Sequence, residues 1–238
     1  MTTKVLVIGA SGDVGQGIVE QLLAGGYQVV AAGRDLDKLR AVKARLGEPP
    51  GLDLIAGSIA DEAAAATLGR EVRRLAPSLA GVVVSVNGPL QTMALAEAES
   101  GAVLEVVRGN LLPHLIAARQ FIPTLPQGAA YVAIGGGMAD LVVPGMGVLS
   151  MCQAAQRAMY AVLARELADT GVRIHNLMLY SMIAGHSNRD RHHPKWITAE
   201  EVGRHLVAVL AHPEWFPEVT LALRSRGEAG QRPADPAA

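Results

Sequence analysis

Three glycines near the N-terminus have the spacing of a phosphate-binding turn. They stand in the segment Gly-Ala-Ser-Gly-Asp-Val-Gly, between a short apolar run and a helical pattern. Glycine lets the backbone approach a pyrophosphate closely, and the amides at a helix N-terminus donate to phosphate oxygens. The residues expected to contact a dinucleotide here are Gly9, Ser11, Gly12, Asp13, Val14 and Gly15. The alternative is a tight turn without a ligand, although three spaced glycines exceed what a turn needs.

The end of the next apolar run suggests which dinucleotide binds. An acidic residue at this position would accept hydrogen bonds from the ribose hydroxyls of NAD, but the chain has Gly33-Arg34. The small residue leaves room for a 2′-phosphate and the arginine can pair with it, which favours NADP. NAD stays possible, because Arg34 could instead be a solvated charge beside Asp35.

The elements that position these residues alternate between strand and helix. Apolar runs predict seven strands, at residues 4–8, 27–32, 52–56, 82–86, 129–134, 172–179 and 219–223. Helical patterns separate them, with longer helices expected over 102–121, kinked at Pro113, and over 149–168. Thr198 and Glu201 form a capping box before a further helix. The pattern predicts an α/β fold, a single Rossmann-like doubly wound domain with a seven-stranded parallel sheet flanked by helices.

Composition narrows the class of protein. The chain has 238 residues, of which 50% are hydrophobic and only 3% aromatic, as expected for buried parallel strands and their covering helices. A formal charge of −1 gives no electrostatic footprint for nucleic acid or an anionic membrane, so neither is expected as a partner. One cysteine, Cys152, excludes an internal disulfide framework, and no metal site is expected. No apolar run is long enough for a signal peptide or a membrane span, so a soluble cytoplasmic protein is expected.

The domain is expected to cover residues 1–223. Residues 224–238 are rich in Gly, Pro, Ala and charged residues, so they are predicted to form a flexible C-terminal tail.

Further segments carry a resemblance to a known family. They are, in order, Ser58-Ile59 with Asp61, Asn87-Gly88, Asn110, and Gly171-Val172-Arg173-Ile174-His175-Asn176. With the glycine turn, they resemble the short-chain dehydrogenase/reductase superfamily from residue 4 to about 223. The resemblance implies that Ser58, Ile59, Asn87 and Gly88 line the cofactor site. It also implies that Asn110 is the family's structural and catalytic asparagine.

The chain departs from that family at its catalytic residues. Members carry a serine at the end of the fifth strand and a Tyr-x-x-x-Lys pair on the following helix. Alignment of that helix puts Leu149 at the tyrosine and Gln153 at the lysine. The serine falls on Gly136, give or take one residue among Gly135 to Gly137. The acid-base assistance that the tyrosine gives, typically worth roughly 10² to 10⁴ in rate, is therefore missing. Gln153 can still hydrogen-bond the nicotinamide ribose, as the lysine does.

One tyrosine could replace the lost proton donor. Tyr180 stands after the sixth strand, at a place that in the family lies beside the nicotinamide. The alternative is that it packs under the following loop and closes the pocket. His186, His192 and His193 of that loop fit no zinc spacing, and His186 is a candidate for substrate contact or proton transfer.

Three functions follow from these observations. The first is an NADP(H)-binding oxidoreductase that acts on a small carbonyl or alcohol with a non-standard active site. The second is a catalytically degenerate cofactor-binding protein, a sensor or the silent partner of an active subunit. The third is a non-redox enzyme of the same fold, such as a cyclase or dehydratase. A homodimer or homotetramer is expected, because the helices over 102–121 and 149–168 resemble the pair that forms the family's subunit interface.

Overall fold

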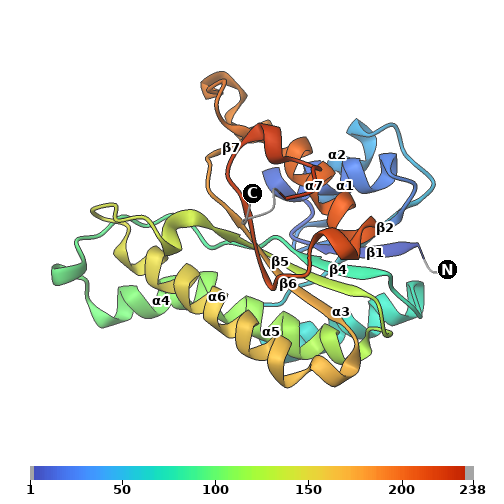
Figure 1. Cartoon of the computed structure of the whole chain (residues 1–238), viewed down its shortest axis with the longest axis horizontal. Coiled ribbons are helices and arrows are strands. Elements are labelled where there is room, and N and C mark those ends of the chain that lie inside the picture. Colours follow the sequence, from blue (N-terminus) through green and yellow to red (C-terminus); the bar gives the residue numbers. More distant parts are fainter. Residues whose placement is uncertain (1–2, 234–238) are drawn as a thin grey trace.

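A seven-stranded parallel sheet forms the centre of the protein in the computed structural model, which describes residues 3–233 (Figure 1). The strand order is β3-β2-β1-β4-β5-β6-β9, so the chain winds outward in both directions from β1. The seven strands are β1 (Lys4–Ile8), β2 (Gln28–Gly33), β3 (Leu52–Ala56), β4 (Gly81–Val84), β5 (Ala130–Gly136), β6 (Arg173–Leu179) and β9 (Thr220–Leu223). The predicted doubly wound α/β fold is confirmed.

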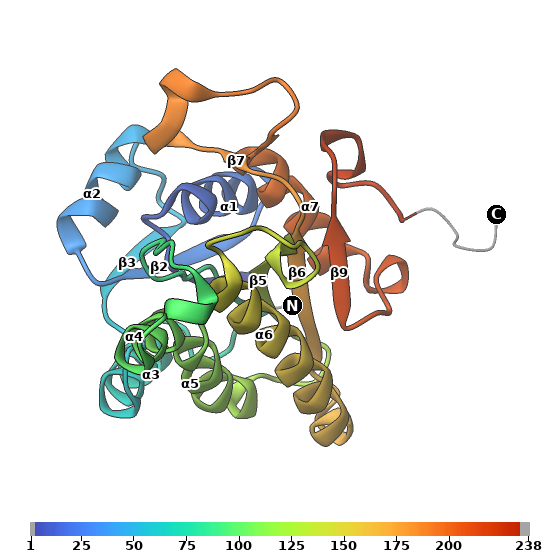
Figure 2. The same ribbon diagram turned by 90° about the vertical axis from the view of Figure 1, so that its left-hand side faces the viewer.

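Helices cover both faces of this sheet (Figure 1). One face carries α1 (Asp13–Ala24), α2 (Leu36–Arg45) and α7 (Ala199–Ala211). The other face carries α3 (Glu62–Leu75), α4 (Ser100–Asn110), α5 (Leu112–Phe121) and α6 (Gly147–Glu166). This arrangement leaves the carboxyl edge of the strands open to loops, which Figure 2 views directly.

Two hydrophobic cores follow from the alternation of side chains along each strand. Val5 and Val7 are fully buried in the core beneath α1 and α7, whereas Leu6 and Ile8 are buried in the core beneath α3 and α5. Successive side chains of a strand point to opposite faces, so an uninterrupted apolar run is what a strand covered on both faces requires. Small and branched aliphatic side chains make up most of both cores, as the composition predicts, and four aromatic residues are buried among them: Phe121, Tyr131, Tyr160 and Phe216.

The expected kinked helix over 102–121 is two helices. Pro113 has no backbone N–H and its ring clashes with the carbonyl one turn earlier, so the first helix cannot continue through it. α4 ends at Asn110 and α5 begins at Leu112. The sequence locates the break to within a few residues.

Two features of the C-terminal half differ from the sequence prediction. β7 (Ile183–Ala184) and β8 (Ile197–Thr198) form a separate two-stranded parallel sheet that the sequence pattern does not predict. Residues 224–230, the first part of the predicted flexible tail, make specific contacts with the rest of the domain. Ala229 is buried, and the Gly230 amide donates to His205. This segment is held by specific partners that its composition does not reveal, and residues 234–238 lie outside the described range.

Within residues 3–233, no helix combines the length and apolar character needed to cross a membrane.

Candidate active site

The glycine turn lies between β1 and α1, at the carboxyl edge of the sheet. Gly9 has φ +85°, and a Cβ there would lie 2.0 Å from the carbonyl oxygen of Ser85. A Cβ on Gly15 would lie 2.1 Å from the carbonyl oxygen of Gly9. Gly12 differs, because it is exposed and its Cβ would meet only the Gly9 oxygen, at 3.4 Å. Packing therefore requires the first and third glycines, while the second leaves the open space in front of α1 that a pyrophosphate would occupy.

Ser11, Asp13 and Val14 surround the same turn. The carbonyl of Ser11 accepts from Gln16 at 3.0 Å, and its hydroxyl oxygen lies 3.4 Å from where a Cβ on Gly33 would stand. Val14 packs against the core, and Asp13 is the first residue of α1. The turn and the end of β2 are therefore adjacent, as a dinucleotide bound across them requires.

The last residue of β2 is the buried Gly33, and the positively charged Arg34 follows it. Arg34 is exposed, and it makes no hydrogen bond or ion pair with any residue of the described chain. The neighbouring Asp35 does not pair with it, because that carboxylate caps α2 by accepting from the amides of Asp37 and Lys38 at 3.0 and 3.1 Å. Arg34 is therefore a solvated charge beside Asp35, as the alternative interpretation of the sequence expects, and its guanidinium is available to a ligand.

The loop after β3 also lies at the carboxyl edge of the sheet. The hydroxyl oxygen of Ser58 accepts from the Ala60 amide at 3.1 Å, and Ile59 is buried in the sheet core. Asp61 caps α3 by accepting from Ala64 at 2.8 Å. These contacts fix the loop where the resemblance places the adenine.

Asn110 ties the loop after β4 to α4. Its carboxamide oxygen accepts from the Gly88 amide at 3.1 Å, and its nitrogen donates to the Val106 carbonyl at 2.9 Å. A Cβ on Gly88 would lie 3.0 Å from the Cα of Gly109, so the loop packs against the helix backbone. Asn87 beside it is exposed at the edge. Asn110 is only 4% exposed, and both ends of its carboxamide are engaged within the protein.

The structure brings Gly136 and Gln153 together. A Cβ on Gly136 would lie 2.5 Å from Nε2 and 2.6 Å from Oε1 of Gln153, so the carboxamide occupies the space where a serine side chain would start. Gln153 is 7% exposed, and its Oε1 has no hydrogen-bond partner within residues 3–233. Leu149 lies one helical turn earlier on α6 and is partly buried. A buried acceptor without a partner costs free energy unless a ligand or water supplies a donor.

Tyr180 belongs to a polar cluster at the ends of β5 and β6. Its hydroxyl donates to the Asp140 carboxylate, to which Arg157 also donates at 2.7 and 2.8 Å. The Arg224 guanidinium lies 3.9 Å from the centre of the Tyr180 ring. The hydrogen bonds from Tyr180 and Arg157 lower the pKa of Asp140, and burial together with Asp140 raises the pKa of Tyr180. The phenol therefore holds its proton more tightly than a free tyrosine, opposite to the shift that a proton donor near neutral pH needs.

The buried His114 links α5 to the segment after β4 and to α6. His114 Nε2 lies 3.0 Å from the Val86 carbonyl, so this nitrogen carries the proton, and Gln156 contacts Nδ1 at 3.4 Å. Gln156 also donates to the Ile134 carbonyl at 3.0 Å. Burial lowers the pKa of His114 to about 4, so the ring is neutral at physiological pH. The contact network joins the ends of β4 and β5 to the helices below them.

The segment from 180 to 198, which we call the lid, runs past α1 and α2 beside the carboxyl edge (Figure 2). The Ser187 amide donates to Asp13 at 2.8 Å, and its hydroxyl donates to the same carboxylate. His192 contacts the Gly185 carbonyl and Asn188 within the segment, both at 2.9 Å, and His186 is exposed. The lid is therefore attached directly to the first turn of α1, beside the glycine turn.

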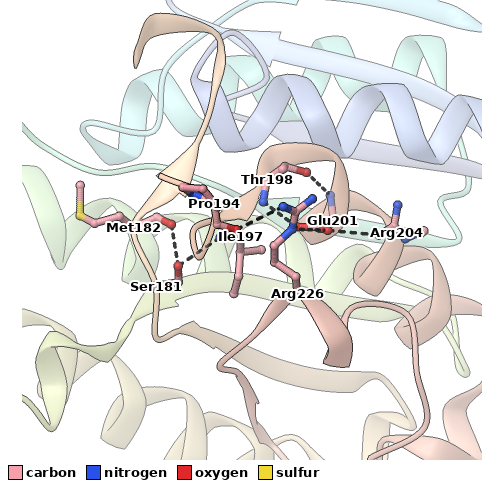
Figure 3. Close-up of polar contacts among 8 residues, drawn as sticks. All are labelled: Ser181, Met182, Pro194, Ile197, Thr198, Glu201, Arg204 and Arg226. Atoms are coloured by element: carbon pink, nitrogen blue, oxygen red, sulfur yellow. Dashed lines mark hydrogen bonds and ion pairs between the residues drawn. The ribbon is translucent and has the colours of Figure 1, made fainter. Parts of the chain in front are cut away.

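The base of this lid is held by Arg226 and Glu201 (Figure 3). Glu201 accepts from Thr198 at 2.8 Å, which completes the predicted capping box, and from Nε of Arg226 at 2.9 and 3.1 Å. Arg226 also donates to the Pro194 carbonyl at 3.3 Å. Ser181 links the two ends of the segment by accepting from the Ile197 amide at 3.1 Å. The residues after β9 thus secure the lid.

The sequence-predicted cofactor residues are gathered along one edge of the sheet, but several partners were not predicted. No local sequence motif marks the following residues, because each forms its hydrogen bond with a residue far away in sequence: Asp140, Arg157, Ser187 and Arg226. The capping box marks Glu201 in the sequence, yet nothing marks the arginine that pairs with it.

Comparisons with known proteins agree with this geometry. Residues 3–194 match the family described as short chain dehydrogenase. A search of curated proteins found no match.

Solved structures of the same fold are similar to the whole chain. An alcohol dehydrogenase from the archaeon Thermococcus sibiricus, complexed with 5-hydroxy-NADP, is 21% identical with a TM-score of 0.80, covering 98% of this chain and 99% of its own. A mutant of a Serratia marcescens short-chain dehydrogenase/reductase is 20% identical with a TM-score of 0.81, covering 93% and 96%. A citronellol catabolism dehydrogenase from Pseudomonas aeruginosa is 22% identical with a TM-score of 0.80, covering 97% and 96%. At these identities the likeness establishes the fold alone.

Proposed function

The chain belongs to the short-chain dehydrogenase family, and we propose that it is an NADP(H)-dependent oxidoreductase acting on a small carbonyl or alcohol. One observation carries the choice of cofactor. The guanidinium of Arg34 is exposed and unpaired among the described residues, directly after Gly33 and beside the glycine turn. An arginine without a competing carboxylate is suited to pair with a 2′-phosphate.

The remaining cofactor contacts follow from the edge of the sheet. Gly12 and the first amides of α1 would face the pyrophosphate, Ser58 and Ile59 the adenine, and Asn87 and Gly88 the neighbouring ribose region. Gln153 fits the nicotinamide ribose, because a ribose hydroxyl would supply the donor that its buried Oε1 lacks. When bound, the cofactor supplies or accepts the hydride at the carbonyl carbon.

The proton step depends on groups other than the family's tyrosine and lysine. Leu149 has no proton to give, and the Gln153 carboxamide can only hydrogen-bond. Tyr180 is a candidate donor, but its hydroxyl is engaged with Asp140. We therefore expect ketone reduction to be slow, by roughly the 10² to 10⁴ that acid-base catalysis contributes.

The cofactor proposal is tested by calorimetry with NADPH and NADH. NADPH should bind more tightly, and Arg34→Ala should remove one charge-assisted contact worth about 1.5 to 3 kcal/mol, a loss of roughly 10- to 150-fold in affinity. Arg40→Ala is the matched control, since Arg40 is an exposed arginine on α2 that pairs with Asp37. Equal affinities for the two cofactors, or no effect of Arg34→Ala, would refute the assignment.

A degenerate cofactor-binding protein is the second candidate, favoured by the residues at the three catalytic positions. A single-turnover assay with NADPH and a panel of carbonyl compounds separates it from an enzyme. Under this candidate no hydride transfer occurs, and the triple variant Leu149→Tyr, Gln153→Lys, Gly136→Ser would be needed to create any. If Tyr180 is the donor, Tyr180→Phe abolishes a substantial wild-type rate instead. Substrate turnover without NADPH oxidation would identify a non-redox enzyme.

We also propose that the protein is a homodimer or homotetramer. The outer face of α6 exposes Ala155, Ala158 and Ala161, small residues that permit close approach of a second helix. Light scattering at micromolar concentration should give a mass above that of one chain.

A further inference from the structure

Large apolar side chains are exposed around the candidate site. Val142 is 99% exposed, Leu90 69% and Leu95 53%, and the neighbours of Val142, Leu141 and Val143, are 49% and 43% exposed. These five residues, which we call the apolar lip, lie in the segments that follow β4 and β5. Exposed apolar side chains that gather in one place usually mark a binding surface.

The two segments of the lip are joined. The Met93 amide donates to the Gly145 carbonyl at 2.9 Å, and a Cβ on Gly147 would lie 3.1 Å from the Leu95 side chain. Gly147 begins α6, which carries Gln153 within its first two turns. The lip is thus continuous with the candidate site, and both follow strands whose carboxyl ends form the edge seen in Figure 2. Met182, in the segment after β6, is 63% exposed. Ligands of open parallel sheets bind at this edge.

The two segments that form the lip carry no charged side chain. Residues 85–96 and 141–156 contain no Asp, Glu, Lys or Arg. The one acid between them and Gly136 is Asp140, whose carboxylate is already bonded to Arg157 and Tyr180. A charged group brought to this surface would lose hydration without gaining a partner, so a neutral ligand is favoured.

We propose that the substrate is a neutral carbonyl or alcohol compound with an extended apolar body, which the lip and Met182 cover. The inference rests on the proposed oxidoreductase function and defines the class of its substrate. The polar end of such a compound lies at Gly136 and Gln153, and the apolar body extends over Leu141–Val143 and Leu90.

The first test is turnover of straight-chain aldehydes from butanal to decanal with NADPH. Each methylene group that the lip covers should raise kcat/KM up to about fourfold. Val142→Asp and Leu90→Asp should flatten this dependence, and since both side chains are exposed the variants should fold normally. Ala63→Asp is the control, because Ala63 is exposed on α3, outside both segments of the lip.

The second test needs no turnover. Decanol should displace a neutral fluorescent dye such as Nile red from the wild type, with and without NADP, and Val142→Asp should weaken this displacement at least several-fold. A flat chain-length profile in an enzyme that reduces aldehydes would overturn the inference and leave the oxidoreductase proposal standing. Decanol binding without hydride transfer to any aldehyde would support the apolar site and refute the oxidoreductase. Dissociation of an oligomer by Val142→Asp, with decanol affinity unchanged, would show that a second copy covers the lip and would overturn the inference.

Discussion

The contact between Gly136 and Gln153 predicts the effect of adding a single methyl group. In Gly136→Ala the new Cβ would lie 2.5 Å from Nε2 and 2.6 Å from Oε1 of Gln153. Ordinary contacts begin near 3.4 Å, so the carboxamide must retreat by almost 1 Å. A hydrogen bond cannot stretch by that amount and survive.

If Gln153 contacts the nicotinamide ribose as proposed, moving its carboxamide should weaken the binding of NADP. Loss of one neutral hydrogen bond costs about 0.5 to 1.5 kcal/mol, which corresponds to a twofold to tenfold rise in the Kd of NADP. Adenosine 2′,5′-bisphosphate, which lacks the nicotinamide ribose, should bind both proteins equally. Gly101→Ala is the control, because a Cβ at that exposed position of α4 meets no atom within 4 Å.

A double-mutant cycle with Gln153→Ala separates displacement of the carboxamide from other effects. If Gly136→Ala acts by moving that group, it should have no further effect on NADP affinity once Gln153 is truncated. Titrations of the four proteins measure the coupling. Additive effects, or equal weakening of the adenosine fragment, would falsify this explanation.

Two further predictions concern stability. Arg226→Ala should lower the free energy of unfolding by about 2 kcal/mol, because it removes two charge-assisted hydrogen bonds from Glu201, whose side chain is 9% exposed. Urea titration should show a much smaller effect for the control Arg74→Ala, because the ion pair of Arg74 with Glu71 is exposed. Equal effects of the two substitutions would refute a structural role for the C-terminal segment. Burial lowers the pKa of His114 and of His175 from 6.5 to about 4. Below pH 6.5 the unfolded chain therefore takes up protons that the folded protein does not. Each histidine should reduce the free energy of unfolding by about 3 kcal/mol as the pH falls from 6.5 to 4. Urea titrations across this range should show a shallower pH dependence for His114→Gln, and an unchanged one would contradict the buried neutral ring.

The fold could be predicted from the sequence because its determinants are local. A strand covered on both faces requires a short uninterrupted apolar run, and residues 4–8 and 52–56 form strands with the predicted bounds. Thr198 and Glu201 stand three residues apart, so their reciprocal bonds could be predicted too. The contact between Arg226 and Glu201 at the base of the lid could not be predicted. Arg226 stands in a segment whose composition suggests flexibility, and Glu201 is 25 residues away in sequence.

The candidate site shows the same division between local and distant determinants. Glycine spacing places Gly9, Gly12 and Gly15, but the sequence does not show which of them packing requires and which leaves space for a ligand. At the positions that the family resemblance assigns to catalysis, the sequence alone treats Gly136 and Gln153 as two separate losses. In the structure they are one change, because the missing Cβ of the first makes room for the carboxamide of the second. A serine restored alone would collide with Gln153, so the two positions must be restored together for the family's chemistry to have a place in this site.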